Sequence, residues 1–291
     1  MALLGLDRGK EAEGIPSDSP LKPPEFKEAL RRRAPRAAII YEAIRMEGED
    51  ELKRPNSALF WSGLAAGLSM GFSLVTEAVL HSYLPDVRWR PLISKLGYSV
   101  GFLIVILGRQ QLFTENTLTP ILPVLRKPSL NLLVQALRLW IVVLAANLIG
   151  TFIFAWTIGH TAILKPRVRA DFRVLGLKDM EGDFLSILLR AVFAGWLIAL
   201  LKWLLPFAKT SRLWVIIIIT YIIGIAGFSH IIAGSVGVFY AVVVGAATWG
   251  DYFVRFMLPT LLGNVIGGVS LVAAINHAQV VYEGNKTQDD L

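Results

Sequence analysis

Cysteine is absent from this sequence, and only four histidines are present. The absence of cysteine excludes disulfide bonds, thiolate metal sites and cysteine nucleophiles, and so few histidines argue against a zinc cluster. The sequence also lacks a G-x-x-x-x-G-K-[ST] loop and a G-x-G-x-x-G turn after a strand, so nucleotide-driven transport by this chain is not expected. No nucleophile, base and orienting group recur at a readable spacing, and we therefore expect neither an enzyme nor a bound metal or cofactor.

Hydrophobic residues are plentiful: they make up 54% of the 291 residues, and the mean hydropathy is +0.56. Soluble domains are roughly 45–50% apolar, and here much of the apolar content is gathered into runs near the length that spans a membrane. The net charge of +7 fits the excess of Lys and Arg on the cytoplasmic side of membrane proteins, and we prefer this explanation to nucleic-acid binding. The composition therefore predicts an all-α integral membrane protein surrounded by lipid.

The two ends of the chain are polar. Residues 1–57 contain SPLKPP, the basic cluster RRRAPR and the segment AAIIYEAIRMEGEDELKR, which predicts an amphipathic helix. We expect a cytoplasmic tail, disordered in part, that lies on the membrane surface. Its first residues, MALLGLDRGKEAEG, have too short an apolar stretch and the wrong charge order for a signal peptide. Residues 280–291 form a second cytoplasmic tail, which leaves 58–279 as the transmembrane domain.

Six apolar runs predict six membrane spans. They cover about 58–80, 92–125, 132–159, 184–206, 213–245 and 257–275. An even number of spans places both termini on one side of the membrane, and that side carries 16 of the 29 Lys and Arg residues against 8 on the other. The positive-inside rule therefore predicts that both termini are cytoplasmic.

The second and fifth spans are interrupted by polar residues, and the interruptions belong to an internal repeat. Asn147, followed by Gly150 and His160, matches Asn264, followed by Gly267 and His277, at a displacement of 117 residues. The interruptions, near Phe113 or Thr114 and at His230, recur at almost the same displacement. Three spans per half make the halves, about 58–160 and 184–277, inverted repeats, a construction in which the solute path lies at the repeat interface.

The interruptions also indicate where function lies, because broken helices leave backbone groups that must face protein or a cavity. His230 at the second break is ionisable, and such groups in membranes tend to mark solute or proton routes. The alternative is a neutral core histidine bonded to backbone. Thr114 at the first break could orient the imidazole, or it could satisfy a loose backbone carbonyl instead.

We expect the charged residues near the breaks and span ends to have structural roles. Arg109 and Glu115 flank the first break, and we expect them to pair as a structural clamp rather than to select solutes. Four further charged residues lie close enough to span ends to act as anchors or interfacial partners rather than pore groups. They are Glu77, Arg138, Arg190 and Lys202.

The strings GRQQLFTENT and AGFSHIIAG, which contain the two breaks, resemble motifs of the formate/nitrite transporter family. That family has a G-x-[ED]-L-F-T-x-N sequence at its first helix break and G-F-x-H at its second. Six spans and the GN-x-x-GG sequence in the last span also agree, over residues 58–279. The strings LGYSVGF, RQQLFTENT, GSVGVFY and NHAQ resemble the YfdC-like branch of the family.

The resemblance implies an aquaporin-like bundle in the inner membrane and a homopentamer with one pore per protomer. It implies passage of small monovalent anions or their neutral weak acids, which exchange a proton at a central pore histidine, here His230. It also implies positions for the residues along the path. Leu112, Phe113 and Thr114 fall on the loop of the first break, Tyr98 and Ile223 near the outer constriction, and Phe102 and Leu112 near the inner one.

The sequence departs from the family pattern at four positions. Gln111 replaces an acidic residue, Ser229 a glutamate and Gly234 an asparagine, while Arg109 is unusual. We therefore predict a passive or proton-coupled pore for small monovalent anions or weak acids with altered selectivity. The alternatives are a neutral-solute, aquaporin-like channel and an occluded membrane protein with a structural or regulatory role.

Overall fold

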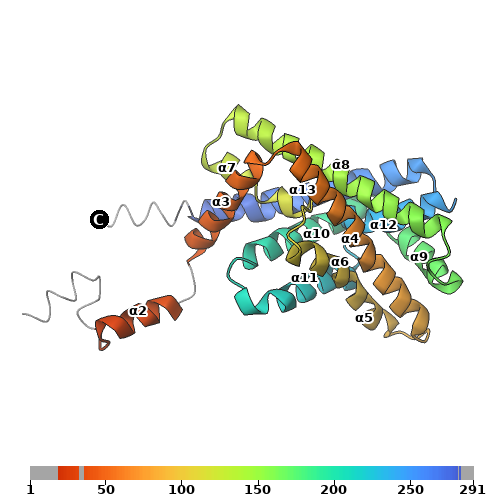
Figure 1. Cartoon of the computed structure of the whole chain (residues 1–291), viewed down its shortest axis with the longest axis horizontal. Coiled ribbons are helices and arrows are strands. Elements are labelled where there is room, and N and C mark those ends of the chain that lie inside the picture. The colour runs from red at the N-terminus through yellow and green to blue at the C-terminus, as the bar shows by residue number, and fades with distance from the viewer. Residues whose placement is uncertain (1–18, 33–35, 281, 283–291) are drawn as a thin grey trace, which may run out of the picture. The chain divides into compact units, whose positions relative to one another are not determined.

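A computed structural model describes residues 19–32, 36–280 and 282 (Figure 1). The chain divides into two units, residues 1–36 and 37–291. The first unit contains helix α2 (Pro23–Arg32). The predicted disorder of the N-terminal tail and most of the C-terminal tail lie outside the described residues. All further contacts described below belong to the second unit.

Within the described residues, six helical segments are long and apolar enough to cross a membrane, as predicted, although the second and fifth end at Leu107 and Ala226, short of the predicted ends at 125 and 245. The first is α4 (Asn56–Tyr83), and the second, Arg90–Leu107, consists of α5 (Arg90–Ser94), η1 (Lys95–Gly97) and α6 (Tyr98–Leu107). The third and fourth are α8 (Leu130–His160) and α10 (Phe184–Leu204). The fifth, Lys209–Ala226, consists of η3 (Lys209–Ser211) and α11 (Arg212–Ala226), and the sixth, Asp251–Val280, contains η4 (Asp251–Met257), α13 (Leu258–Ile266) and η5 (Gly267–Ala274). The described secondary structure is helical throughout.

Two of these helices stop within the bundle and are followed by a second short helix. After α6 ends at Leu107, the chain passes through the 3-10 turn η2 (Glu115–Thr117) and resumes as α7 (Ile121–Arg126). After α11 ends at Ala226, Gly227 adopts the left-handed conformation, with φ of +66°, and α12 (Ile231–Val243) begins four residues later. A left-handed residue at this position closes a helix, and glycine adopts it without strain.

Glycines allow the long helices to approach closely. A Cβ atom on Gly67 of α4 would lie 2.2 Å from the carbonyl oxygen of Asn147 on α8, and one on Gly195 of α10 would lie 2.2 Å from the carbonyl oxygen of Asn264 on α13. Small residues at helix contacts are the usual device for close packing in membranes, because no hydrophobic force drives the helices together in lipid. The two helix pairs therefore have their closest contact at equivalent asparagines.

Two helices differ from the sequence predictions. α3 (Ala37–Lys53) forms, but it buries Tyr41, Ile44 and Leu52 against the protein and contacts α7, α8 and α10. The apolar face expected to lie on a membrane surface is thus covered by the protein itself. The region 160–183, predicted as a polar loop, contains α9 (Pro166–Lys178), which packs against α4 and α12.

Candidate functional site

Thr114 and His230, predicted at separate breaks, are in contact. The Oγ1 atom of Thr114 lies 2.7 Å from Nε2 of His230, and both side chains are buried, with at most 1% exposed. His230 also caps α12, because its Nδ1 accepts a hydrogen bond from the backbone N–H of Ala233 at 3.1 Å. A neutral ring whose Nδ1 accepts must carry its proton on Nε2, so Nε2–H donates to Thr114. The threonine hydroxyl proton remains available for a further acceptor.

Asn147 holds the first break by three hydrogen bonds. Its Oδ1 accepts from the backbone N–H of Phe113 at 2.9 Å, and its Nδ2 donates to the carbonyl oxygens of Gln111 and Gly63 at 2.9 and 2.7 Å. Two of these bonds satisfy backbone groups of the break that have no helical partner. A buried backbone group without a partner is costly.

Asn264 holds the second break by the same three kinds of bond. Its Oδ1 accepts from the backbone N–H of Ile231 at 2.9 Å, and its Nδ2 donates to the carbonyl oxygens of Ser229 and Ala191 at 2.9 and 2.8 Å. The predicted positions of both asparagines at the breaks therefore agree with the contacts in the structure.

Aromatic side chains extend the site along α6. The ring of Phe102 lies edge-on to the His230 ring, with centroids 5.1 Å apart, and the ring of Tyr98 lies 5.3 Å from that of Phe102. Ile223 is buried on α11, and the residue after it, Gly224, lies against the side chain of Tyr98. Tyr98, Phe102 and His230 thus follow one another through the middle of the bundle.

Two of the three residues predicted on the loop of the first break, Leu112 and Phe113, have side chains with different neighbours. Leu112 is fully buried and lines a cavity on the inner side of the break. The ring of Phe113 lies against Trp140 of α8, with centroids 6.0 Å apart. Phe113 is therefore directed toward α8.

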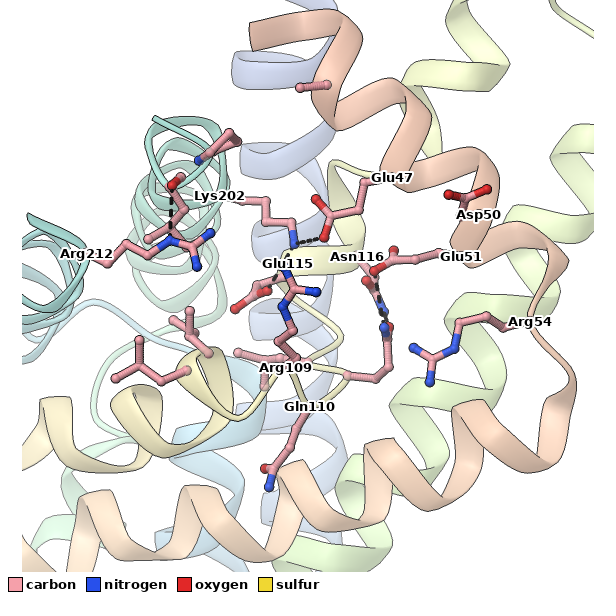
Figure 2. A pocket seen from close by; sticks show the side chains of 17 residues that line it. Glu47, Asp50, Glu51, Arg54, Arg109, Gln110, Glu115, Asn116, Lys202 and Arg212 are labelled. Atoms are coloured by element: carbon pink, nitrogen blue, oxygen red, sulfur yellow. Dashed lines mark hydrogen bonds and ion pairs between the residues drawn. The ribbon is translucent and has the colours of Figure 1, made fainter. Parts of the chain in front are cut away.

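The inner cavity, of about 560 Å³, lies between α3, the first break and the ends of α10 and α11 (Figure 2). Acidic and basic side chains line it together. They are Glu47, Asp50, Glu51, Arg54, Arg109, Glu115, Lys202 and Arg212. Lys202 pairs with Glu47 at 2.9 Å and with Glu115 at 3.7 Å, so of the two predicted roles, anchor or interfacial partner, these contacts favour that of a partner.

The predicted clamp between Arg109 and Glu115 is wrong. Glu115 takes Lys202 as its ion-pair partner, and among the described residues no carboxylate lies within 4 Å of the Arg109 guanidinium. Arg109 has φ of +52°, a left-handed conformation that is uncommon for residues other than glycine. This turn in the backbone accompanies a side chain that reaches into the inner cavity, as Figure 2 shows.

A network around Glu51 was not predicted. Its carboxylate accepts hydrogen bonds from Nε2 of Gln111 at 3.1 Å and from Oγ1 of Thr119 at 2.8 Å, and Oε1 of Gln111 accepts from Nδ2 of Asn116 at 2.7 Å. The available signal was position: Glu51 shares the buried face of α3 with Tyr41 and Ile44. A carboxylate on a buried helix face requires partners.

The outer cavity lies at the opposite end of α6 and holds only about 20 Å³. It is lined by Ser73, Leu74, Glu77, Lys95, Tyr98, Leu175, Asp179 and Ala233. Glu77 is 1% exposed and pairs with Lys95 at 2.5 Å, so of the two predicted roles, anchor or interfacial partner, the contact favours that of a partner. Asp179, at the end of α9, was not predicted as part of any site.

Metal binding is not supported by the described residues. Among residues 19–32, 36–280 and 282, no group of three or more histidine, aspartate or glutamate side chains could hold a metal ion.

Comparisons with known proteins agree with the resemblance drawn from the two breaks. The model of the family described as formate/nitrite transporter matches residues 38–278. The inner membrane protein YfdC of Escherichia coli (strain K12) is 42% identical over 245 residues, which cover 84% of this chain and 79% of YfdC. The formate channel BtFdhC of Bacillus thuringiensis is 28% identical over 247 residues, which cover 80% of this chain and 91% of the channel.

A solved structure has the same fold. A pentameric formate channel with formate bound superposes with a TM-score of 0.66 at 20% identity, over 78% of this chain and 97% of the channel. The family match covers most of the chain, including both helix breaks and both asparagines that hold them. This chain therefore belongs to the formate/nitrite transporter family.

Proposed function

We propose that this chain is a membrane channel or transporter for small monovalent anions or their weak acids, with its central site at Thr114 and His230. The observation that carries the proposal is their 2.7 Å contact, because it joins two helix breaks that lie 116 residues apart in the chain. Broken helices are tolerated in a membrane where they line a path. Formate channels among the similar proteins support the choice of a small anion.

In this proposal, residues 58–279 form the channel domain, with two inverted repeats at about 58–160 and 184–277. The equivalent hydrogen bonds of Asn147 and Asn264 support the repeat. The close contacts at Gly67 and Gly195, each against the carbonyl of one of these asparagines, support it independently. The path then runs between the repeats, past the two breaks.

The contacts of His230 also define its part in the mechanism. A second proton would have to bind Nδ1, which accepts the N–H of Ala233, so protonation would break the cap of α12. We therefore assign His230 to polarising Thr114, whose hydroxyl then donates to the passing anion. Because desolvating an anion costs far more than desolvating its neutral acid, a proton-coupled cycle through this path needs a proton donor other than His230.

Flux into proteoliposomes tests the proposal. The purified full-length protein should carry formate and acetate, and His230→Asn should reduce the flux by about tenfold or more. His160→Asn is the matched control, because His160 is exposed at the end of α8 and stacks on Trp156. Full flux in His230→Asn would overturn the role of the histidine, and absence of flux in the unmodified protein would overturn the function.

A second candidate function follows from the packing between the two cavities. Phe102, Leu112 and His230 are each at most 1% exposed, which also fits an occluded protein with a structural or regulatory role. Stopped-flow swelling with and without an anion gradient separates the alternatives. Water flux without anion flux would indicate a neutral-solute channel, and neither flux would indicate an occluded protein.

We further propose a homopentamer in the inner membrane, with both termini cytoplasmic. The pentameric formate channel of the same fold and the inner membrane relative support the assembly and the location. The excess of Lys and Arg on the side of the termini supports the orientation. Large apolar side chains exposed on α8 and η4, such as Ile141 and Val254, are available to lipid or to neighbouring protomers.

A further inference from the structure

Gly234 leaves room for a carboxylate beside the candidate path. Gly234 lies one helical turn after His230 on α12, and its backbone N–H donates to the carbonyl oxygen of His230. A Cβ atom at Gly234 would lie 3.2 Å from Oδ2 of Asp179 and 2.6 Å from the ring of Phe256. The carboxylate of Asp179 therefore lies against the bare backbone of α12 at Gly234, four residues after the histidine.

Asp179 shares the outer cavity with an ion pair that does not include it. Lys95 pairs with Glu77 at 2.5 Å, and within the part of the chain that the structure describes no cation lies within 4 Å of the Asp179 carboxylate. The cavity, of about 20 Å³, has space for about one water molecule. An ionised Asp179 therefore has no ion-pair partner among the described residues at this small cavity.

The surroundings of Asp179 bear on its protonation. The charged and titratable groups that face it from its own and neighbouring elements are Glu77, Lys95, Tyr98, Lys178 and Arg190. The pKa of Asp179 is raised to about 6, chiefly by burial and also by Glu77, against the opposing effect of Lys95, Arg190 and Lys178. Both the protonated and the ionised forms are therefore present near neutral pH.

We propose that Asp179 is a specificity-determining residue at the outer end of the path, which lets weak acids pass and holds back the anions of strong acids. This inference rests on the proposed function. An ionised carboxylate in a small, poorly hydrated cavity repels an anion strongly, whereas a neutral acid meets no such repulsion. The substrate class is thereby narrowed to small weak acids, such as short monocarboxylic acids.

A protonated Asp179 also supplies the donor that His230 does not. The O–H bond of Asp179 breaks, a new O–H bond forms on a carboxylate oxygen of the substrate, and Asp179 is left ionised. Asp179 then regains a proton from the outer solution. Nitrate, the anion of a strong acid, does not accept the proton and so cannot pass as a neutral acid, and it is repelled whenever Asp179 is ionised.

The test compares formate and nitrate flux in proteoliposomes of the full-length protein. The unmodified protein should carry formate, and its flux per formate ion should fall about tenfold as the pH rises from about 5 to about 7, because Asp179 loses its proton over this range. Nitrate flux should be about a tenth of formate flux or less. Asp179→Asn should raise nitrate flux by about tenfold and abolish the pH dependence of the normalised formate flux.

Controls separate the effect of the carboxyl group from a folding defect. Asp171→Asn changes the same residue type on α9, where Asp171 pairs with His81 at 3.1 Å, and should behave as the unmodified protein. Asp179→Glu should restore nitrate exclusion. If Asp179→Asn does not elute as a folded protein, Asp179→Ser tests the same loss of the acid with a smaller side chain.

The outcomes separate this inference from the function on which it rests. Formate flux in the unmodified protein, together with unchanged nitrate exclusion and pH dependence in Asp179→Asn, would overturn the inference alone. Absence of formate flux in the unmodified protein would overturn the proposed function and the inference with it. If Asp171→Asn gained nitrate flux as Asp179→Asn does, nitrate exclusion would depend on the total charge of α9. That result would also overturn the role of Asp179.

Discussion

The first helix break, residues 108–120, and the second, residues 227–230, differ in length and in what they present to the path. The first is a long segment that opens on a large charged cavity and contributes a hydroxyl, Thr114. The second is a tight turn closed by a left-handed glycine, and it contributes an imidazole that caps the next helix. One asparagine with the same three hydrogen bonds holds each of them. The two breaks are thus held by the same kind of bonds, but one contributes a hydroxyl and the other an imidazole. This difference makes the site between them asymmetric.

The largest effect that tests this comparison is loss of the asparagines. Asn147→Leu and Asn264→Leu each leave two buried backbone groups of a break without partners, at a cost of about 1–3 kcal/mol per group. We expect both variants to lose about 2 kcal/mol or more of stability, measured by thermal unfolding in detergent. Asn131→Leu, on the exposed start of α8, is the control. A large effect at only one break would contradict their equivalent support.

Close helix contact at the two glycines should give the next largest effect. A Cβ atom at Gly67 or Gly195 would lie 2.2 Å from a carbonyl oxygen, so alanine forces the helices apart at a cost of about 1–3 kcal/mol. Gly250→Ala is the matched control, because its Cβ would lie 3.5 Å from the nearest atom, an ordinary contact. Unfolding temperatures of Gly67→Ala and Gly195→Ala equal to that of the control would show that the helices have room to spare.

A titratable carboxyl group close to the second break should make stability depend on pH. Burial raises the pKa of Asp179 to about 6 from its ordinary value of 3.8, so the folded protein binds the proton more tightly than the unfolded chain. The contribution of Asp179 to stability is therefore fully present below about pH 4 and is lost as the pH rises through about 6, by about 1 kcal/mol after allowance for solvent screening. Asp179→Asn should remove this slope from the unfolding curves, and an identical slope in the variant would assign it to another group.

The smallest expected effect concerns the attachment of α3 beside the first break. Glu47 pairs with Lys202, and its side chain is 45% exposed, so Glu47→Gln should cost only about 0.5 kcal/mol. Lys202→Gln should cost more, because it also leaves the buried Glu115 without its ion-pair partner. Protease cleavage after Lys53, at the end of α3, provides the measurement. Equal cleavage rates in the two variants would show that the pair with Glu115 adds nothing.

Much of the fold could be predicted from the sequence, because membrane spans follow from the local length and hydrophobicity of each run. α9 was missed, although Val168, Phe172 and Leu175 have helical spacing and are buried. The basic residues between them hide this pattern in a polar composition. α3 was predicted as a helix, but whether its apolar face would meet lipid or protein depends on the other helices.

The candidate site was predictable only in part. Thr114 and His230 could be singled out because a helix break in a membrane needs a reason, and their contact follows once two breaks face each other. The partner of Glu115 could not be predicted, because Lys202 comes from α10 and the pairing depends on the packed bundle. Asp179 could not be predicted either, since its position depends on an α9 that the sequence did not reveal and on the space left at Gly234.

The account claims above all that the two breaks act together through one contact. A double-mutant cycle of formate flux, with Thr114→Val, His230→Asn and the double variant, measures this directly. If Thr114 and His230 act as a unit, the double variant should lose no more flux than the more impaired single variant. Losses that multiply in the double variant would show that the two residues act independently and would contradict the account.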